Sequence, residues 1–324
     1  MDANADTTVA DSSERSPVLI TAFNRPAELR RLIASLRSHY PTKLYIAIDG
    51  ARLSHPGEEE RVATCIDIVR NLKWPAPVQL LIQESNLGCG AAVPAALAWF
   101  FEQEPEGIVL EDDIDPTSAF FTFAEKALER FRDKPEVFLA SGCNFVPWAS
   151  AQFEEPWRRT RYPRIWGWVS WSDRWNCYTR QMPSFLSIPK IQRLWRWTNG
   201  SLSETIYWVR QFQRVRSGRL DTWDYQLVAH SVETNCEFVA TNTNLINNTG
   251  WGGDATHTRS APSFLLPAAS ILPDDWAWDA DAWRSESADA WERRHVFGVS
   301  GTNLLCKALM SIRARLGFSS RARL

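Results

Sequence analysis

The sequence contains no long hydrophobic run. Among its 324 residues, no stretch approaches the roughly 18 consecutive apolar residues that a membrane-spanning helix needs. The first 16 residues are acidic and rich in Ser and Thr, whereas a secretory signal would be basic and then apolar. We therefore expect a cytoplasmic protein that has neither a transmembrane helix nor a secretory signal.

Cysteine and net charge are also low. The six cysteines lie far apart, without the short paired spacing of a zinc site, and are too few for a disulfide scaffold, so we interpret them as reduced thiols. Lys and Arg total 36 against 38 Asp and Glu, which gives a net charge of −2. Such a surface is not built to neutralise a nucleic-acid backbone, and we expect no nucleic-acid partner.

Tryptophan is abundant, with 17 residues. Carbohydrate-handling proteins use indole faces to stack on sugar rings, but indole also fills protein cores well. We expect most of these side chains to pack in the core. Their number alone therefore does not identify a sugar-binding protein.

The first half of the chain alternates short apolar runs with helical patterns. Strands are predicted at 17–23, 43–48, 78–83, 107–110 and 137–142, and helices at 27–39, 58–72, 89–102 and 119–132, with Pro94 interrupting the third helix. A further helix is predicted at 203–217 and a strand at 238–240, whereas residues 146–200 give no clear assignment. The alternation predicts an α/β fold with a mostly parallel sheet flanked by helices.

Composition divides the chain into three parts. Residues 1–16 are polar and aperiodic, which predicts a disordered leader. The alternating pattern fills 17–260, and 261–324 is predicted to wrap around that domain and to end in a basic helix at 303–315. We favour packing of this helix against the domain; the alternative is peripheral contact with an acidic membrane surface, such as the inner face of the cell membrane.

Three carboxylates in succession, Glu111, Asp112 and Asp113, end one predicted strand. They repel one another, so such a cluster persists most readily where a divalent cation neutralises it. Arg25 and Asp49 also follow predicted strands, and in a parallel sheet the carboxyl ends of strands bind ligands along one edge. Mg²⁺ or Mn²⁺ held by one or two carboxylates and by substrate phosphates would suit this edge. A solvated acidic turn is the alternative.

Two later motifs carry further candidate groups. Asp224 follows Trp223, and burial beside aromatic side chains can tune a carboxylate for work as a general base. The alternative is a structural Asp bonded to a turn. Residues 250–257 form a glycine-rich segment that ends in His257, which suits a loop that closes over a ligand. The His257 imidazole is a candidate metal ligand or phosphate contact, unless the loop is unspecialised.

In this order the motifs resemble those of GT-A glycosyltransferases, in particular the N-acetylglucosaminyltransferase I group and its bacterial relatives, the nucleotide-diphospho-sugar transferases. The similarity extends over residues 18–257. It rests on a strand that leads to Arg25, a strand that ends in Asp49, Glu111-Asp112-Asp113 followed by an aromatic helix, Trp166 to Trp171, Trp223-Asp224, and residues 247–257. Each motif is modest alone, whereas their shared order is specific.

The resemblance implies a role for each matched residue. Arg25 and Asp49 are implied to contact the uridine nucleotide, Asp112 the ribose, Asp113 the metal, and Asp224 is implied to be the catalytic base. The other residues placed at the donor are Glu111, Trp168 and Trp223, and His257 is the further candidate at the metal. Residues 17–260 are then expected to form a GT-A catalytic domain.

The function expected from this resemblance is inverting transfer of a sugar from a nucleotide-diphosphate donor to a hydroxyl group, with Mn²⁺ or Mg²⁺ as cofactor. The donor is expected to be a UDP-sugar, and the acceptor a glycan, a lipid-linked molecule or a protein, as in surface glycan biosynthesis. A sugar-1-phosphate nucleotidyltransferase is one alternative, but its usual glycine-rich basic loop is replaced here by Asn24-Arg25-Pro26. A non-catalytic glycan-binding protein is the other.

Overall fold

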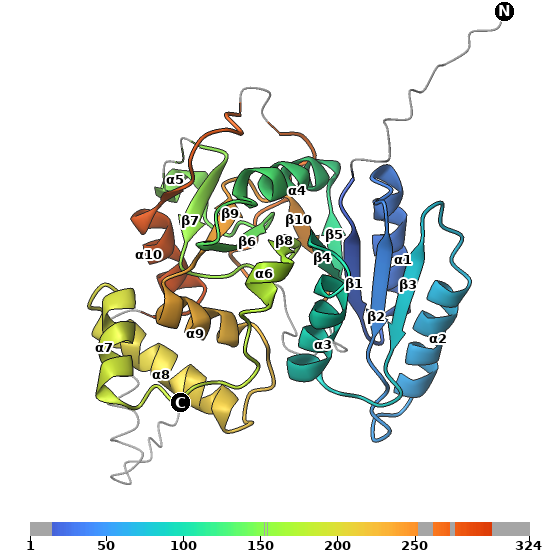
Figure 1. The fold of residues 1–324 in the computed structure, drawn as a ribbon, viewed down its shortest axis with the longest axis horizontal. Helices are drawn as coiled ribbons and strands as arrows, with labels where there is room; N and C mark the ends of the chain where they lie inside the picture. The colour runs from blue at the N-terminus through green and yellow to red at the C-terminus, as the bar shows by residue number, and fades with distance from the viewer. Residues whose placement is uncertain (1–14, 152, 154, 252–261, 273–275, 300–324) are drawn as a thin grey trace, which may run out of the picture.

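A computed structural model describes residues 15–151, 153, 155–251, 262–272 and 276–299. Nine strands form one sheet: β1 (Val18–Ala22), β2 (Leu44–Ile48), β3 (Val78–Ile82), β4 (Glu106–Glu111), β6 (Val137–Ser141), β7 (Trp157–Thr160), β8 (Trp168–Trp171), β9 (Glu237–Thr241) and β11 (Trp283–Arg284). Two more, β5 (Ile114–Pro116) and β10 (Ile246–Asn248), form a small antiparallel sheet. Figure 1 shows the large sheet running through the whole molecule.

The large sheet is mixed and mostly parallel. Its order is β11-β7-β9-β6-β8-β4-β1-β2-β3. The strands β3, β2, β1 and β4 run parallel to one another, as do β6 and β9, whereas β8 is antiparallel to both of its neighbours, β4 and β6. The predicted α/β class, with a mostly parallel sheet flanked by helices, is confirmed.

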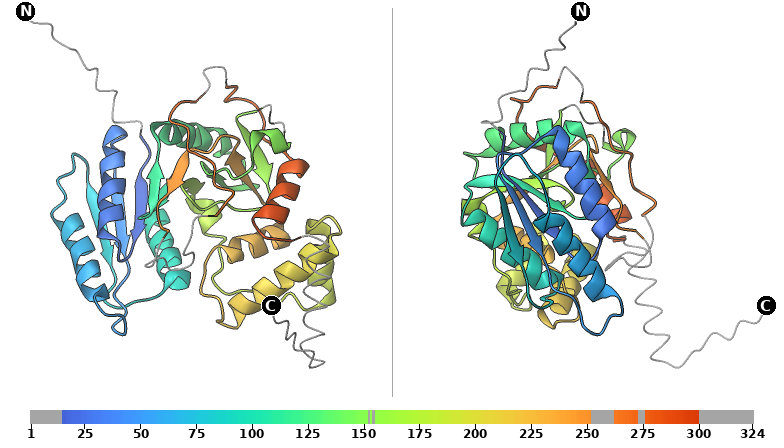
Figure 2. Two further views of the ribbon diagram at one scale, coloured as in Figure 1. Left: turned by 180° about the vertical axis from the view of Figure 1, so that it is seen from behind. Right: turned by 90° about the vertical axis from the view of Figure 1, so that its right-hand side faces the viewer.

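Helices cover both faces of this sheet (Figure 2). They are α1 (Pro26–Ser35), α2 (Glu58–Arg70), α3 (Cys89–Phe101), α4 (Ser118–Phe131), α5 (Trp148–Ala151), α6 (Ser172–Trp175), α7 (Ile188–Trp197), α8 (Leu202–Arg216), α9 (Tyr225–Thr234) and α10 (Glu286–His295), with a 3₁₀ turn at Leu36–Ser38. Alternate side chains of β1 point to opposite faces of the sheet. Val18 and Ile20 pack in the core with α1, α2 and α4. Leu19 packs in the core on the other face, with α3 and α9. A strand covered on both faces is apolar throughout, which explains the continuous hydrophobic run in β1.

The predicted interruption of the third helix at Pro94 is wrong, because α3 continues through this residue. Proline lacks the N–H that would bond to the carbonyl of Gly90, one turn earlier. The Nε of Arg180 donates to that carbonyl instead, at 3.1 Å. A side chain from 90 positions along the chain thus satisfies the acceptor that Pro94 leaves open.

Buried ion pairs join the C-terminal part of the described chain to the sheet. The Glu292 side chain on α10 is fully buried and lies 3.2 Å from Arg158 and 2.6 Å from Arg164. Next to it, Asp289 accepts a hydrogen bond from Thr160 at 2.7 Å, and burial together with the charge of Glu292 raises the pKa of Asp289 to about 7. These contacts place α10 against β7, and β11 adds a strand beyond β7.

Within the described ranges, no helix is long and apolar enough to cross a membrane. The predicted leader, apart from residues 15 and 16, and the predicted basic helix at 303–315 lie outside the described residues. Residues 146–200, which gave no clear assignment, contain β7, β8 and α5 to α7.

We predict that Glu292→Gln lowers the free energy of unfolding by about 3–5 kcal/mol, because two buried guanidinium groups lose their carboxylate partner. Urea unfolding followed by circular dichroism measures the change. The matched control is Glu129→Gln, which removes an exposed pair with Lys126 and should change stability by no more than about 0.5 kcal/mol. Equal effects of the two substitutions would contradict a structural role for the buried cluster.

Candidate functional site

A cavity of about 600 Å³ lies at the carboxyl ends of β1, β2 and β4. Its walls come from the ends of these strands, the start of α3, residues 165–166, residues 220–225, and residues 248–251. Because β4, β1 and β2 are parallel neighbours, the polar residues that follow them meet at one edge. The size is typical of a site for a small organic ligand, for which roughly 300–1,000 Å³ is usual.

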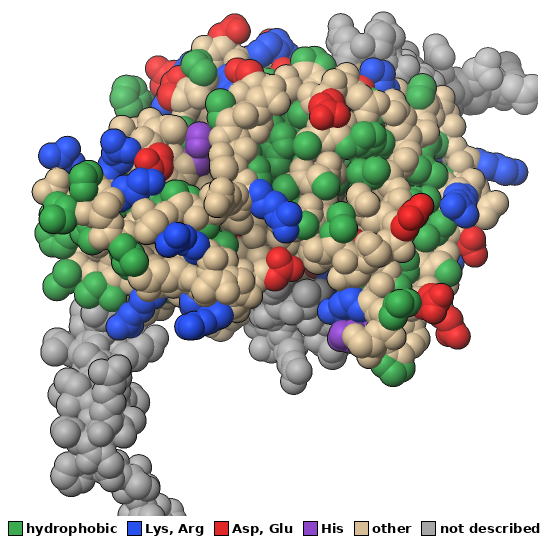
Figure 3. Space-filling view, turned by 60° about the horizontal axis from the view of Figure 1, so that its bottom comes forward, with side chains coloured by type: hydrophobic (Ala, Val, Ile, Leu, Met, Phe, Trp, Pro, Cys, Tyr) green, Lys and Arg blue, Asp and Glu red, His purple; other side chains and the backbone are tan. Residues whose placement is uncertain are grey.

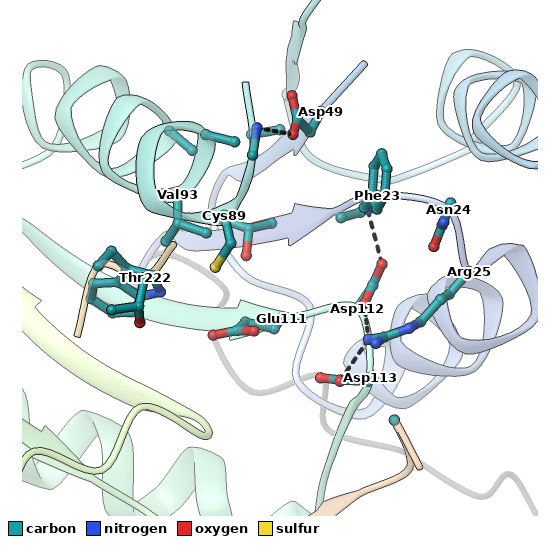
Figure 4. A pocket seen from close by; sticks show the side chains of 18 of the residues that line it. Phe23, Asn24, Arg25, Asp49, Cys89, Val93, Glu111, Asp112, Asp113 and Thr222 are labelled. Carbon is teal, nitrogen blue, oxygen red and sulfur yellow. Dashed lines mark hydrogen bonds and ion pairs between the residues drawn. The ribbon is translucent and has the colours of Figure 1, made fainter. Parts of the chain in front are cut away.

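The structure brings Arg25 and the acidic cluster together in this cavity (Figure 4). One nitrogen of Arg25, Nη1, lies 2.6 Å from Asp113 Oδ2 and 3.2 Å from Asp112 Oδ1. The second oxygen of Asp112 accepts a hydrogen bond from the backbone N–H of Phe23 at 2.9 Å. Asp112 is therefore held on both sides by the loop that follows β1.

Two carboxylate oxygens in the cluster have no such partner. Asp113 Oδ1 and Glu111 Oε1 are buried and accept no hydrogen bond from the described residues. Burial, which disfavours the charged form, is the main cause that raises the pKa of all three acids, and repulsion by neighbouring acids of the cluster adds to the effect at Glu111 and Asp112. The pKa of Asp112 rises to about 6, and that of Glu111 rises well above its ordinary range.

These oxygens fit a hard divalent cation. Such ions bind carboxylate oxygens, and Mg²⁺ or Mn²⁺ at a phosphate-binding site often takes only one or two from the protein. Asp113 Oδ1 and Glu111 Oε1 are buried acceptors without a hydrogen-bond donor among the described residues, and a bound cation would satisfy them by direct coordination. Within the described part of the chain, no group of three or more His, Cys, Asp or Glu side chains is arranged to hold a metal ion by itself.

Asp49 also lines the cavity, but its oxygens already accept four hydrogen bonds. Oδ1 accepts from the N–H groups of Gly50 and Leu87, each at 2.9 Å. Oδ2 accepts from Asn86 Nδ2 at 2.9 Å and from the N–H of Gly88 at 3.1 Å. Asp49 therefore fixes the loop that leads into α3, and this loop forms part of the cavity wall.

Asp224 lies in the same cavity as the acidic cluster. It is the residue that precedes α9, and its Oδ1 accepts a hydrogen bond from the hydroxyl of Thr222. Its charge contributes to the raised pKa of Glu111, so the two carboxylates are within electrostatic reach of each other. The structure thus places Asp113, Glu111 and Asp224 around one space.

Of the two tryptophans on either side of Gly167, the one that lines the cavity is Trp166. Trp168 is fully buried in β8, where it stacks on Trp223 with ring centroids 5.9 Å apart. Gly167 has a φ of +65°, which turns the chain between the two indoles. Trp168, expected at the donor, therefore supports Trp223 from behind, while Trp223 itself reaches the cavity wall.

The segment after β10 closes one side of the cluster. The backbone N–H of Thr249 donates to the Asp113 carbonyl at 2.8 Å, and Gly250 approaches the Asp113 carboxylate so closely that a Cβ would collide with it. Trp251 follows and packs edge-on against Trp166, with centroids 5.5 Å apart. The remainder of this glycine-rich segment, including the candidate ligand His257, lies outside the described residues.

Sequence reasoning missed two groups in the cavity. Asp221 lines it and accepts a hydrogen bond from the N–H of Gly90 at 3.1 Å, in the first turn of α3. Cys89 also lines this cavity, and Figure 4 shows its thiol. The sequence did offer a signal for Asp221, because this acidic residue lies three positions before Asp224, in the polar segment that precedes α9. Nothing in the sequence distinguishes Cys89 from the core cysteines.

Comparison with known proteins adds no assignment. No protein-family model matches the chain, and no curated protein matches it. The functional argument therefore rests on the residues and their geometry.

We predict that Glu111→Gln stabilises the protein at alkaline pH in the absence of divalent cations. Because the fold raises the pKa of Glu111 above its ordinary value of 4.5, the native state prefers the protonated acid, and ionisation lowers its stability. Calorimetry in EDTA should show a higher Tm for the variant at about pH 8, and the difference should vanish as the pH falls to about 5.

The control is Glu84→Gln, since Glu84 is exposed and outside the cavity. It should show no pH-dependent difference from the wild type. If Glu111→Gln is no more stable than the wild type at about pH 8, the folded protein does not disfavour the ionised form of Glu111, and the prediction is wrong.

Proposed function

We propose that this protein is a metal-dependent inverting glycosyltransferase of the GT-A type, which transfers a sugar from a nucleotide-diphosphate donor to a hydroxyl group. The observation that carries the proposal is that one cavity contains both the carboxylate cluster after β4 and Asp224 before α9. The chemistry needs these two parts face to face, one for the departing diphosphate and one for the attacking alcohol.

Each side of the cavity has its own task. Asp224 accepts the proton of the acceptor hydroxyl while that oxygen forms a bond to the anomeric carbon of the donor sugar. The bond from that carbon to the diphosphate oxygen breaks on the opposite face, and the electron pair leaves with the nucleotide diphosphate. Attack and departure on opposite faces invert the configuration, so no covalent sugar–enzyme intermediate is needed.

The metal site of this proposal is built on Asp113. Mn²⁺ or Mg²⁺, when bound, would supply positive charge to the leaving diphosphate. Asp113 Oδ1 and Glu111 Oε1 are the buried oxygens that would hold it, and Arg25 adds a fixed positive charge from the loop after β1. Asp112, held by Arg25 and the Phe23 N–H, is the candidate contact for the ribose.

The indole rings of Trp166 and Trp251 are the candidate surface for the sugar. They meet edge to face in the cavity wall, and aromatic faces stack well on the apolar faces of sugar rings. A uridine nucleotide is the donor that the resemblance implies. The acceptor class, a glycan, a lipid-linked molecule or a protein, follows from that same resemblance alone.

We predict that Asp224→Asn lowers the rate of sugar transfer by about 10²–10⁴, because the proton acceptor is lost. The affinity for the nucleotide-sugar should stay within a factor of about two, since Asp224 does not hold the donor. A transferase assay and calorimetry on the same preparation separate the two quantities. Asp115→Asn, a carboxylate change in β5 outside the cavity, should leave both unchanged. Unaltered transfer by Asp224→Asn would rule out its role as the base.

We also predict that a nucleotide-sugar raises the Tm only when Mn²⁺ or Mg²⁺ is present. A ligand at about 100 times its Kd stabilises the native state by about 2.7 kcal/mol, which shifts the Tm by several degrees. Asp113→Ala should abolish the metal-dependent part of this shift in a thermal screen of UDP- and GDP-sugars. A response to free glycans without any response to nucleotides would identify a glycan-binding protein instead.

A further inference from the structure

Helix α7 presents an apolar stripe to the exterior. Ile188, Ile191 and Trp195 follow the i, i+3, i+7 spacing of one helix face and are 72%, 38% and 42% exposed. The opposite face of the helix is the one that packs inward, through Leu194 and through Trp197, whose Nε1 donates to Ser231 at 3.0 Å. The stripe is therefore not needed to attach α7 to the domain.

Neighbouring residues extend this stripe. Of the ten large hydrophobic side chains that are exposed in the described part of the chain, five lie between residues 186 and 202. We call them the α7–α8 patch: Leu186, Ile188, Ile191, Trp195 and Leu202. Apolar side chains gathered in this way mark an interaction surface, whereas single exposed ones are ordinary.

The same stretch of chain is strongly basic. Residues 186–219 contain seven lysines and arginines and one acidic residue, Glu204, which is buried. Two of the basic residues, Lys190 and Arg193, pair with Glu233 on α9. The other five form no ion pair with a described residue: Arg196, Arg210, Arg214, Arg216 and Arg219. Figure 3 shows hydrophobic side chains interspersed with Lys and Arg over α7 and α8.

Exposed apolar side chains beside these arginines favour one kind of binding partner. A second copy of the chain would bring the same positive charge to a symmetric contact, which repulsion disfavours. An anionic bilayer offers an apolar boundary for Ile and Trp side chains and phosphate groups for arginines in the same plane. Charge complementarity supports this occupant, because the chain as a whole has a net charge of −2 whereas residues 186–219 carry an excess of six positive charges.

We propose that the α7–α8 patch docks the protein on the surface of an anionic lipid bilayer. The apolar stripe lies at the level of the headgroups, and the flanking arginines contact lipid phosphates. The patch includes no residue of the basic segment at 303–315, which lies outside the described residues. The proposal goes beyond the proposed function, because it holds whatever the cavity binds.

Vesicle sedimentation with the full-length protein tests the proposal. The wild type should bind vesicles of equal parts phosphatidylcholine and phosphatidylglycerol, more weakly as salt increases, and should not bind vesicles of phosphatidylcholine alone. Ile188→Asn with Leu202→Asn should weaken binding about tenfold by removing apolar contact. Arg196→Glu with Arg210→Glu should weaken it by at least about tenfold by reversing charge.

Matched controls change exposed residues elsewhere. Leu53→Asn with Ile271→Asn replaces side chains that are 90% and 82% exposed, and Arg31→Glu with Arg70→Glu reverses charge on α1 and α2. Both control variants should bind vesicles as the wild type does, and all four should keep the wild-type Tm.

Three results would overturn the proposal. The first is that the wild type does not bind the anionic vesicles, or binds neutral ones equally well. The second is that the α7–α8 variants bind as tightly as the wild type, which would place binding on another segment, such as 303–315. The third is a dimer of the wild type in light scattering that the Ile188→Asn, Leu202→Asn variant loses, which would show that a second copy covers the patch.

Discussion

Three carboxyl groups lie at the end of β4, and a single guanidinium pairs with two of them. Arg25 pairs with Asp112 and Asp113, and two oxygens of the cluster are buried without a donor among the described residues. Unmatched negative charge in a buried place lowers the stability of the fold, unless protons or a cation reduce it. Burial therefore favours protonation of the cluster. In the proposed function, a divalent cation would replace those protons and keep the carboxylates ionised.

The packing of Trp168 and Trp223 in the core helps to position Asp224 relative to this cluster. Trp168 on β8 stacks on Trp223, and both belong to the apolar core that also holds Val109 of β4. Because β8 pairs directly with β4, the indole pair connects the strand that ends in the acids to the residue beside Asp224. Buried aromatic side chains thus connect the position of Asp224 to that of the acidic cluster.

The first half of the fold could be predicted from sequence because its strands are short runs of mostly apolar residues and its helices carry regularly spaced apolar residues. The edge that gathers Arg25, Asp49 and Asp113 followed from the parallel order of β4, β1 and β2. Residues 146–200 could not be assigned because β7 contains arginines that are usually exposed. Arg158 is buried there because partners far along the chain accept from it, among them Glu292, 134 positions away, and the carbonyl of Thr241. In the same way, only a left-handed turn at Gly167 decides that Trp166 and not Trp168 reaches the cavity.

The first turn of α3 carries a further consequence. Helix starts often receive phosphate groups, because their free N–H groups and the helix dipole attract negative charge. Here the carboxylate of Asp221 already accepts from the Gly90 N–H, and Gly88 and Gly90 leave room for it by having no Cβ. An incoming phosphate would meet a like charge at this helix. In the proposed function, the diphosphate would therefore be contacted by the guanidinium of Arg25 and not by the start of α3.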